Sequence, residues 1–143
     1  NAQQEYLIDL FIERFADDFV LKLHPASKLD RNKYKNFIVK TSFSFETMLI
    51  DYDISDFTLV SILSTVGLTP KLMFDQEPTL LYLYKLVDFS KNKNISKDFF
   101  LTIEQLRHLY SFNSVYTPDS HKELEHIMLL NPFLSKRSEN EKN

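Results

Sequence analysis

Hydrophobic residues recur every three or four positions in several parts of the chain, which is the spacing of one face of an α-helix. The first set predicts a helix over residues 3–16 and consists of Leu7, Leu10, Phe11 and Phe15. Two further sets are Phe45, Met48, Leu49 and Tyr52, and then Phe99, Ile103, Leu106 and Tyr110. Another helix is predicted after Ser120, because Ser120 and Glu123 have the spacing of a capping box ahead of an apolar run.

Apolar runs between these helices predict β-strands. The main runs are Phe19–Leu23, Phe57–Ile62 and Thr79–Val87, with a shorter one at residues 37–39. The first two are nearly continuous in hydrophobicity, which is typical of strands buried in a parallel sheet. Because helices and strands alternate, we expect an α/β fold with a Rossmann-like parallel sheet and flanking helices. We assign this domain to residues 1–134 and regard residues 135–143 as a polar tail.

The segment after Phe57–Ile62 contains Gly67, followed by Thr69 and Pro70. A threonine before a proline is typical of an N-cap and the first residue of a helix. The residues from Ser64 onward therefore predict either one kinked helix or two short helical pieces.

The composition excludes several classes of site. The 143 residues include no Cys, which excludes disulfides, Cys–zinc sites and thiol nucleophiles, and one Gly, which cannot supply either glycine-rich nucleotide motif. The 17 Lys and Arg are outnumbered by 20 Asp and Glu, and no basic stripe indicates a nucleic-acid partner. The most apolar window, residues 57–74, is too polar to predict a membrane span. The start at Asn1 leads us to expect a piece of a longer chain.

Polar residues follow two of the predicted strands directly. His24 and Pro25 come after Phe19–Leu23, and Ser64 and Thr65 come after Phe57–Ile62. Ligands bind at the carboxyl ends of the strands in open parallel sheets. Two hydroxyls and the N–H groups that open a helix favour a phosphate, and an imidazolium can add a charge-assisted hydrogen bond. The structural alternatives are a turn at His24-Pro25 and a helix cap at Ser64-Thr65.

Three motifs together resemble a known family. They are Leu21-Lys-Leu-His-Pro25, Phe43-Ser-Phe-Glu46 and Val60-Ser-Ile-Leu-Ser-Thr65. Their order and spacing, within residues 6–87, are similar to those of bacterial sialyltransferases with the two-domain GT-B architecture. The resemblance is greatest to the lipooligosaccharide and capsule sialyltransferases of glycosyltransferase family 52. It implies that this chain is a CMP-donor-binding half of such an enzyme.

The resemblance also implies roles for single residues and a donor, CMP-sialic acid. His24 would contact the donor phosphate and act catalytically by assisting the departure of CMP, while Pro25 would pack on the cytosine. Glu46 would bind the ribose hydroxyls, although its place in the first turn of a helix is also favourable for any carboxylate. Ser64 and Thr65 would hold the phosphate. No metal and no other cofactor is required by this scheme.

These sialyltransferases carry an Asp/Glu-Asp/Glu-Gly motif, whose acid deprotonates the acceptor, in their amino-terminal domain. Gly67 follows Thr65-Val66, so this chain lacks the motif, and we expect it to be the carboxyl-terminal half without its amino-terminal GT-B domain. The implied acceptor is a cell-surface glycan, and the implied location is the bacterial cytoplasm. The basic residues Lys28, Arg31, Lys33 and Lys35 are expected in a solvated loop, which could also attract an anionic acceptor or the inner-membrane surface.

Two alternatives stay open. One is a related capsule or teichoic-acid polymerase that uses a CDP-linked donor. The other is a non-catalytic α/β or helical interaction domain whose aromatic surface docks a partner, which predicts an exposed apolar patch. We do not assign a metal site to Asp51-Tyr-Asp53, because it precedes a strand and resembles a solvated turn. His121 and His126 are five residues apart, which is not the spacing of a zinc pair on one helical face, so surface positions are expected. Tyr82 and Tyr84 are expected to share one face of a strand, where they would serve packing.

Overall fold

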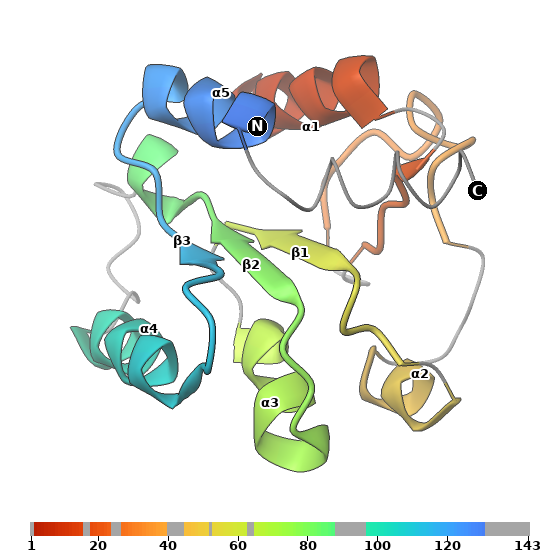
Figure 1. The fold of residues 1–143 in the computed structure, drawn as a ribbon. Coiled ribbons are helices and arrows are strands. Elements are labelled where there is room, and N and C mark those ends of the chain that lie inside the picture. Colours follow the sequence, from red (N-terminus) through yellow and green to blue (C-terminus); the bar gives the residue numbers. More distant parts are fainter. Residues whose placement is uncertain are drawn as a thin grey trace. The chain divides into compact units, whose positions relative to one another are not determined.

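The computed structural model describes residues 2–15, 18–23, 27–39, 45–51, 53–62, 65–87 and 97–130. The chain forms two compact units, residues 1–43 and residues 44–143, and each is described separately. The second unit is a mixed α/β structure with a small parallel sheet (Figure 1). The predicted α/β class is therefore confirmed at this level.

The first unit begins with helix α1, Ala2–Phe15, close to the predicted range of 3–16. Leu7 and Phe11 are buried, as their spacing predicts. Glu5 lies in the first turn and Arg14 in the last, where each charge interacts favourably with the helix dipole. The helix is thus explained by an apolar stripe together with favourable charges at both ends.

The predicted strand Phe19–Leu23 is reduced to one bridge in the first unit. Leu21 pairs in parallel with Ile38, and its N–H donates to the carbonyl oxygen of Phe37 at 2.8 Å. The prediction of a buried strand is wrong here, because 71% of the Val20 surface is exposed and Lys22 is also exposed. The run therefore has one covered side, and a strand buried on both faces does not form.

The basic loop of the first unit is attached to α1 by a small polar cluster. The buried Tyr34 donates its hydroxyl hydrogen to Asp9 at 2.9 Å. Lys33 lies 3.4 Å from Asp9 and 3.6 Å from Glu5. Lys28, Arg31, Lys33 and Lys35 are all exposed, so the prediction of a solvated loop is confirmed. Lys33 in addition pairs with the acidic face of α1.

The sheet of the second unit has three parallel strands among the described residues, in the order β1-β2-β3. They are β1, Thr58–Ser61, β2, Thr79–Tyr82, and β3, Val115–Tyr116. In the register, Leu80 is opposite Leu59 on one side and Val115 on the other. Parallel neighbours need a crossover connection, which helical segments provide here.

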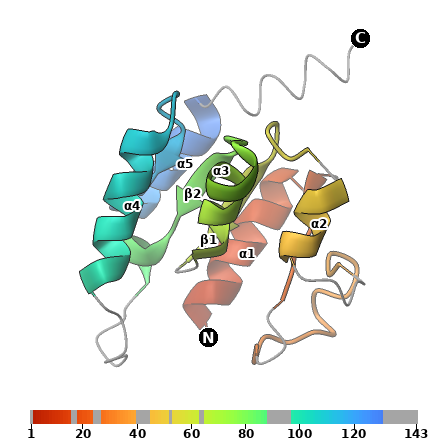
Figure 2. The same ribbon diagram turned by 90° about the horizontal axis from the view of Figure 1, so that it is seen from below.

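The helical segments flank this sheet. They are α2, Phe45–Asp51, the 3-10 turn η2, Thr65–Leu68, α3, Thr69–Phe74, the 3-10 turn η3, Tyr84–Leu86, α4, Lys97–Leu109, and α5, His121–Leu130. Figures 1 and 2 show α3 and α4 on one face of the sheet and α5 on the other. The unit is therefore a three-layer arrangement of helix, sheet and helix.

The central strand β2 supplies the core on both faces. Leu80 and Tyr82 are buried with Ile103 and Leu106 of α4 in one hydrophobic cluster. Leu81 alternates with them and therefore points to the opposite face, on which α5 lies (Figure 1). All three strand residues have about 1% of their surface exposed. Burial on both faces explains why residues 79–82 form a strand without an alternating polar pattern.

The structure corrects the prediction for the two outer strands. Phe57–Ile62 was expected to be a buried strand, but β1 lies at an edge of the three-stranded sheet, and Phe57 and Val60 are 48% and 38% exposed. The strand β3 was not predicted, because its two residues are too few for a hydrophobic pattern. Sheet order, which depends on pairing between distant residues, decides the burial of each strand.

Two short helical pieces follow β1, which resolves the alternative left open by the sequence. The turn η2 leads directly into α3, whose N-cap is Leu68 and not Thr69, and the cap makes no side-chain hydrogen bond. Pro70 occupies the first turn, where its missing N–H has no cost. The helix ends at Asp75, which has φ of 50° and donates its N–H to the carbonyl oxygen of Lys71.

Gly67 lies directly against the side chain of Tyr82. A Cβ atom at position 67 would lie 2.7 Å from the Tyr82 hydroxyl oxygen and 3.4 Å from Leu80 Cδ2. The hydroxyl is buried and has no hydrogen-bond partner in the described part of the chain. A glycine is therefore required here by the close approach of η2 to the central strand, and not by an unusual φ angle.

This contact predicts coupling between positions 67 and 82. Gly67→Ala should lower the free energy of unfolding by about 1–3 kcal/mol through overpacking. In a Tyr82→Phe background the cost should be smaller, because the atom that the methyl group meets is gone. Urea denaturation of the single and double variants measures the coupling. Equal costs in both backgrounds would contradict the contact.

Alkaline pH gives a second test of the same side chain. Burial raises the pKa of Tyr82 to about 12, whereas an unfolded tyrosine titrates near about 10. The folded chain thus holds a proton that the unfolded chain has lost, so stability is intact below about pH 10 and falls as the pH rises toward 12. Urea denaturation across this range should show a smaller fall for Tyr82→Phe. Tyr110→Phe is the comparison variant. Burial also raises the pKa of Tyr110, so this variant should likewise lose less stability at alkaline pH than the unchanged chain.

Candidate functional site

Five residues were predicted to form the site, and the structure describes none of their side chains. His24, Pro25 and Ser64 lie outside the described residues. Glu46 is the second residue of α2, and Thr65 is the first residue of η2, but only their backbone is described. The grouping of the five therefore stays a prediction.

The described residues on either side of Ser64 define where the second motif lies. β1 ends at Ser61, and η2 begins at Thr65. β1 therefore ends before the segment that contains the second motif, and the position of the Ser64 and Thr65 side chains stays a prediction. The expected helix start is altered, however, because a four-residue 3-10 turn precedes α3, which itself has six residues. We therefore do not use a helix dipole as an argument for phosphate binding here.

A polar cluster that the sequence did not predict lies at the carboxyl ends of β2 and β3. Lys85, in η3, lies 3.0 Å from a carboxylate oxygen of Asp119. Arg107, on α4, donates from Nη2 to the hydroxyl oxygen of Thr117 at 2.5 Å. Thr117 directly follows β3, and Lys85 is three residues beyond the end of β2. The cluster is therefore built from two strand ends and one covering helix.

The cluster contains two cations that act on each other. The hydrogen bond with Asp119 raises the pKa of the Lys85 amine, while the charge of Arg107 acts in the opposite direction. Arg107 Nε is buried and has no hydrogen-bond acceptor among the described residues, and the nearest carboxylate oxygen, from Glu104, is 3.6 Å away. Lys85 also lies over the ring of Tyr84, 5.9 Å from its centroid. Lys85 and Arg107 thus each contact a residue within positions 117–119, and each has a carboxylate within 4 Å.

The sequence offered one weak signal for this cluster. Val115 and Tyr116 have high strand propensity and lie between polar Asn113-Ser114 and Pro118. If these two residues had been predicted as a strand, Thr117 would have been expected at the carboxyl end of that strand. Arg107 could not have been found in this way, because it reaches the cluster from a helix.

Charged residues at the opposite, amino end of the sheet serve the fold. Glu77 accepts a hydrogen bond from the backbone N–H of Ser111 and lies 3.2 Å from Lys71. Burial acts to raise the pKa of Glu77, but these two partners outweigh it and hold the pKa below its usual value. Tyr110 donates its hydroxyl hydrogen to the carbonyl oxygen of Pro78 at 3.1 Å. These bonds connect α4 and α3 to the start of β2.

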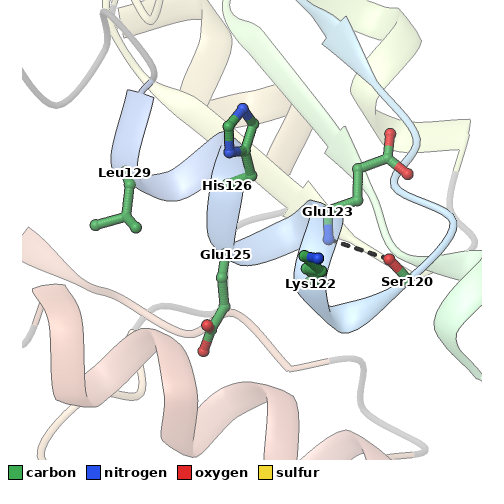
Figure 3. Close-up of a pocket in the computed structure, with 6 residues that line it drawn as sticks. All are labelled: Ser120, Lys122, Glu123, Glu125, His126 and Leu129. Atoms are coloured by element: carbon green, nitrogen blue, oxygen red, sulfur yellow. Dashed lines mark hydrogen bonds between the residues drawn. The ribbon is translucent and has the colours of Figure 1, made fainter.

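A shallow hollow lies along the surface of α5. Figure 3 shows its lining residues, which all come from this helix and its cap: Ser120, Lys122, Glu123, Glu125, His126 and Leu129. Ser120 accepts a hydrogen bond from the N–H of Glu123 at 3.1 Å, and Glu123 accepts one from the N–H of Asp119 at 2.8 Å. The predicted capping box is therefore confirmed for the bond that Ser120 accepts, whereas the Glu123 carboxylate reaches Asp119, one residue before the N-cap. The hollow is therefore a surface of one capped helix, to which no other element contributes a lining residue.

The motifs that we did not assign to chemistry lie in a turn, at exposed positions or against other aromatic rings. Asp53 accepts a hydrogen bond from the N–H of Ser55 at 2.9 Å, which lowers the pKa of Asp53 and forms a turn. His121 and His126 are exposed. Within the described ranges, no group of three or more His, Asp or Glu side chains is placed to hold a metal ion. Tyr84 lies in η3 beyond the end of β2, so the expected shared strand face is wrong, but both tyrosines pack against Phe99, with ring centroids 6.2 and 6.0 Å away.

Comparison of the chain with models of protein families, with curated proteins and with solved structures finds no match. The resemblance to sialyltransferases therefore depends on the three motifs alone. The helices in the described part of the chain include none that is both long and apolar enough to cross a bilayer.

Proposed function

We propose that this chain is the donor-binding part of a GT-B glycosyltransferase that transfers sialic acid from CMP-sialic acid to a cell-surface glycan. The main support is the parallel strand β1, whose carboxyl end leads directly to Ser64 and Thr65. A small open parallel sheet with helices on both faces is compatible with a Rossmann-like arrangement. Such sheets bind nucleotides at this edge.

The proposed chemistry assigns one task to each predicted residue. The bond between the sugar's anomeric carbon and the donor phosphate oxygen breaks, and the electron pair leaves with CMP. Ser64, Thr65 and a protonated His24 stabilise the charge that grows on the phosphate. An acceptor hydroxyl bonds to the anomeric carbon, and its proton passes to a carboxylate of the second GT-B domain. Glu46 binds the ribose, and Pro25 packs on the cytosine.

Two rivals make different use of the same fold. A polymerase with a CDP-linked donor would use the same strand ends and differ in the sugar that it transfers. A non-catalytic docking domain is favoured by one specific observation: Leu72 and Met73 on α3 are 64% and 68% exposed. Neighbouring exposed apolar side chains of this kind are typical of a surface that meets a partner. That rival predicts no response to nucleotides.

A titration with CMP, followed by backbone amide NMR, tests the proposal. We expect shifts concentrated at residues 24, 46 and 64–67, weaker shifts with UMP, and at least a tenfold loss of affinity in His24→Ala. His108→Ala is the matched control, because His108 is an exposed histidine on α4. If millimolar CMP moves none of these amides in a folded chain, the donor-binding proposal is wrong.

A further inference from the structure

We propose that Lys85, Arg107 and Thr117 form a phosphate-binding site at the carboxyl ends of β2 and β3. The three side chains come from η3, from α4 and from the residue after β3. The site is distinct from the five residues predicted for the donor and requires neither sialic acid nor cytidine. Its ligand is a small molecule with a phosphate group.

Arg107 is already oriented for an anion. Its bond to Thr117 holds one terminal nitrogen of the guanidinium group, and about one-third of the side chain, 32%, remains exposed. A guanidinium carries five N–H donors, of which the described contacts use one as a hydrogen bond. The remaining terminal donors can bind two phosphate oxygens side by side, which is the geometry that arginine favours.

Thr117 contributes a donor of its own. Its oxygen accepts from Arg107, so its hydroxyl hydrogen is directed elsewhere. Among the described contacts of Thr117, none is a hydrogen bond that this hydroxyl donates. A threonine hydroxyl donates one hydrogen bond, and a phosphate oxygen beside Arg107 would receive it. Arg107 and Thr117 together therefore present donors of two kinds to one side of the cluster.

Asp119 shows how Lys85 holds an oxyanion. Its carboxylate lies 3.0 Å from the Lys85 nitrogen, yet 72% of the Asp119 side chain is exposed. An exposed ion pair of this kind contributes little to stability, about 0–1 kcal/mol. A phosphate group carries about 1.5 to 2 negative charges at pH 7, which exceeds the single charge of Asp119. Phosphate can therefore replace the carboxylate at Lys85 while also neutralising Arg107.

The structural alternative is that Lys85–Asp119 and Arg107–Glu104 are surface ion pairs without a ligand. The two interpretations differ in the role of Asp119. In the phosphate site, Asp119 competes with the ligand, so its removal should increase phosphate affinity. If the two contacts are only surface ion pairs, the chain should not bind phosphate, either with or without Asp119.

The test is a titration with inorganic phosphate at constant ionic strength, followed by NMR of the Arg107 Nε–H and the amides of Lys85 and Thr117. We expect saturable shifts, a loss of at least fivefold in affinity for Arg107→Gln and Lys85→Met, and a gain of about threefold for Asp119→Asn. Lys71→Met should not change the affinity, because Lys71 pairs with Asp75 and Glu77 at the opposite end of the sheet. Acetate, a carboxylate with one charge, should bind more weakly.

Shifts that do not saturate, an unchanged affinity in Asp119→Asn, or equal binding of acetate would each overturn the phosphate assignment. Asp119→Asn keeps the test decisive if Arg107→Gln fails to fold. The outcome is separable from the donor proposal. If phosphate acts at Thr117 while CMP moves no amide at residues 64–67, the phosphate site stands and the donor proposal fails.

Discussion

The close contact between Gly67 and Tyr82 is the constraint on which the second unit depends. It brings the turn after β1 to within contact distance of the central strand, at the edge where the strands end. A side chain larger than hydrogen at position 67 would push η2 away from Tyr82. The same contact buries a tyrosine hydroxyl without a described partner, which has a cost of about 1–3 kcal/mol. Apolar packing of Tyr82 against α4 offsets that cost.

The two ends of the parallel sheet have different chemistry. At the amino end, Glu77 is saturated by Lys71 and Ser111, and these bonds hold helices in place. At the carboxyl end, Lys85 and Arg107 are compensated by exposed carboxylates that can be displaced. This difference between the two ends is typical of open parallel sheets, in which ligands bind in the loops that follow the carboxyl ends of the strands. The donor proposal and the phosphate proposal both concern this edge.

Sequence patterns within a few residues of one another predicted the helices, because neighbouring residues determine a helix and its cap. The stripe that contains Leu7 and Phe11 gave α1, and the pair Ser120 and Glu123 gave the start of α5. Sheet order could not be predicted in this way, so β1 was wrongly expected to be buried and β3 was missed. The cluster of Lys85, Arg107 and Thr117 depends on pairing between residues far apart in the chain, and no local pattern contains it. Of the predicted site, the structure describes only the backbone positions of Glu46 and Thr65.

The central claim is that the carboxyl edge of the β1-β2-β3 sheet binds the ligand. A crystal structure of the chain with bound CMP tests it most directly. The account predicts the CMP phosphate beside Ser64 and Thr65, with its oxygens on the carboxyl side of β1 and β2. CMP bound at the amino end, beside Lys71 and Glu77, or along the outer surface of α5 would contradict it.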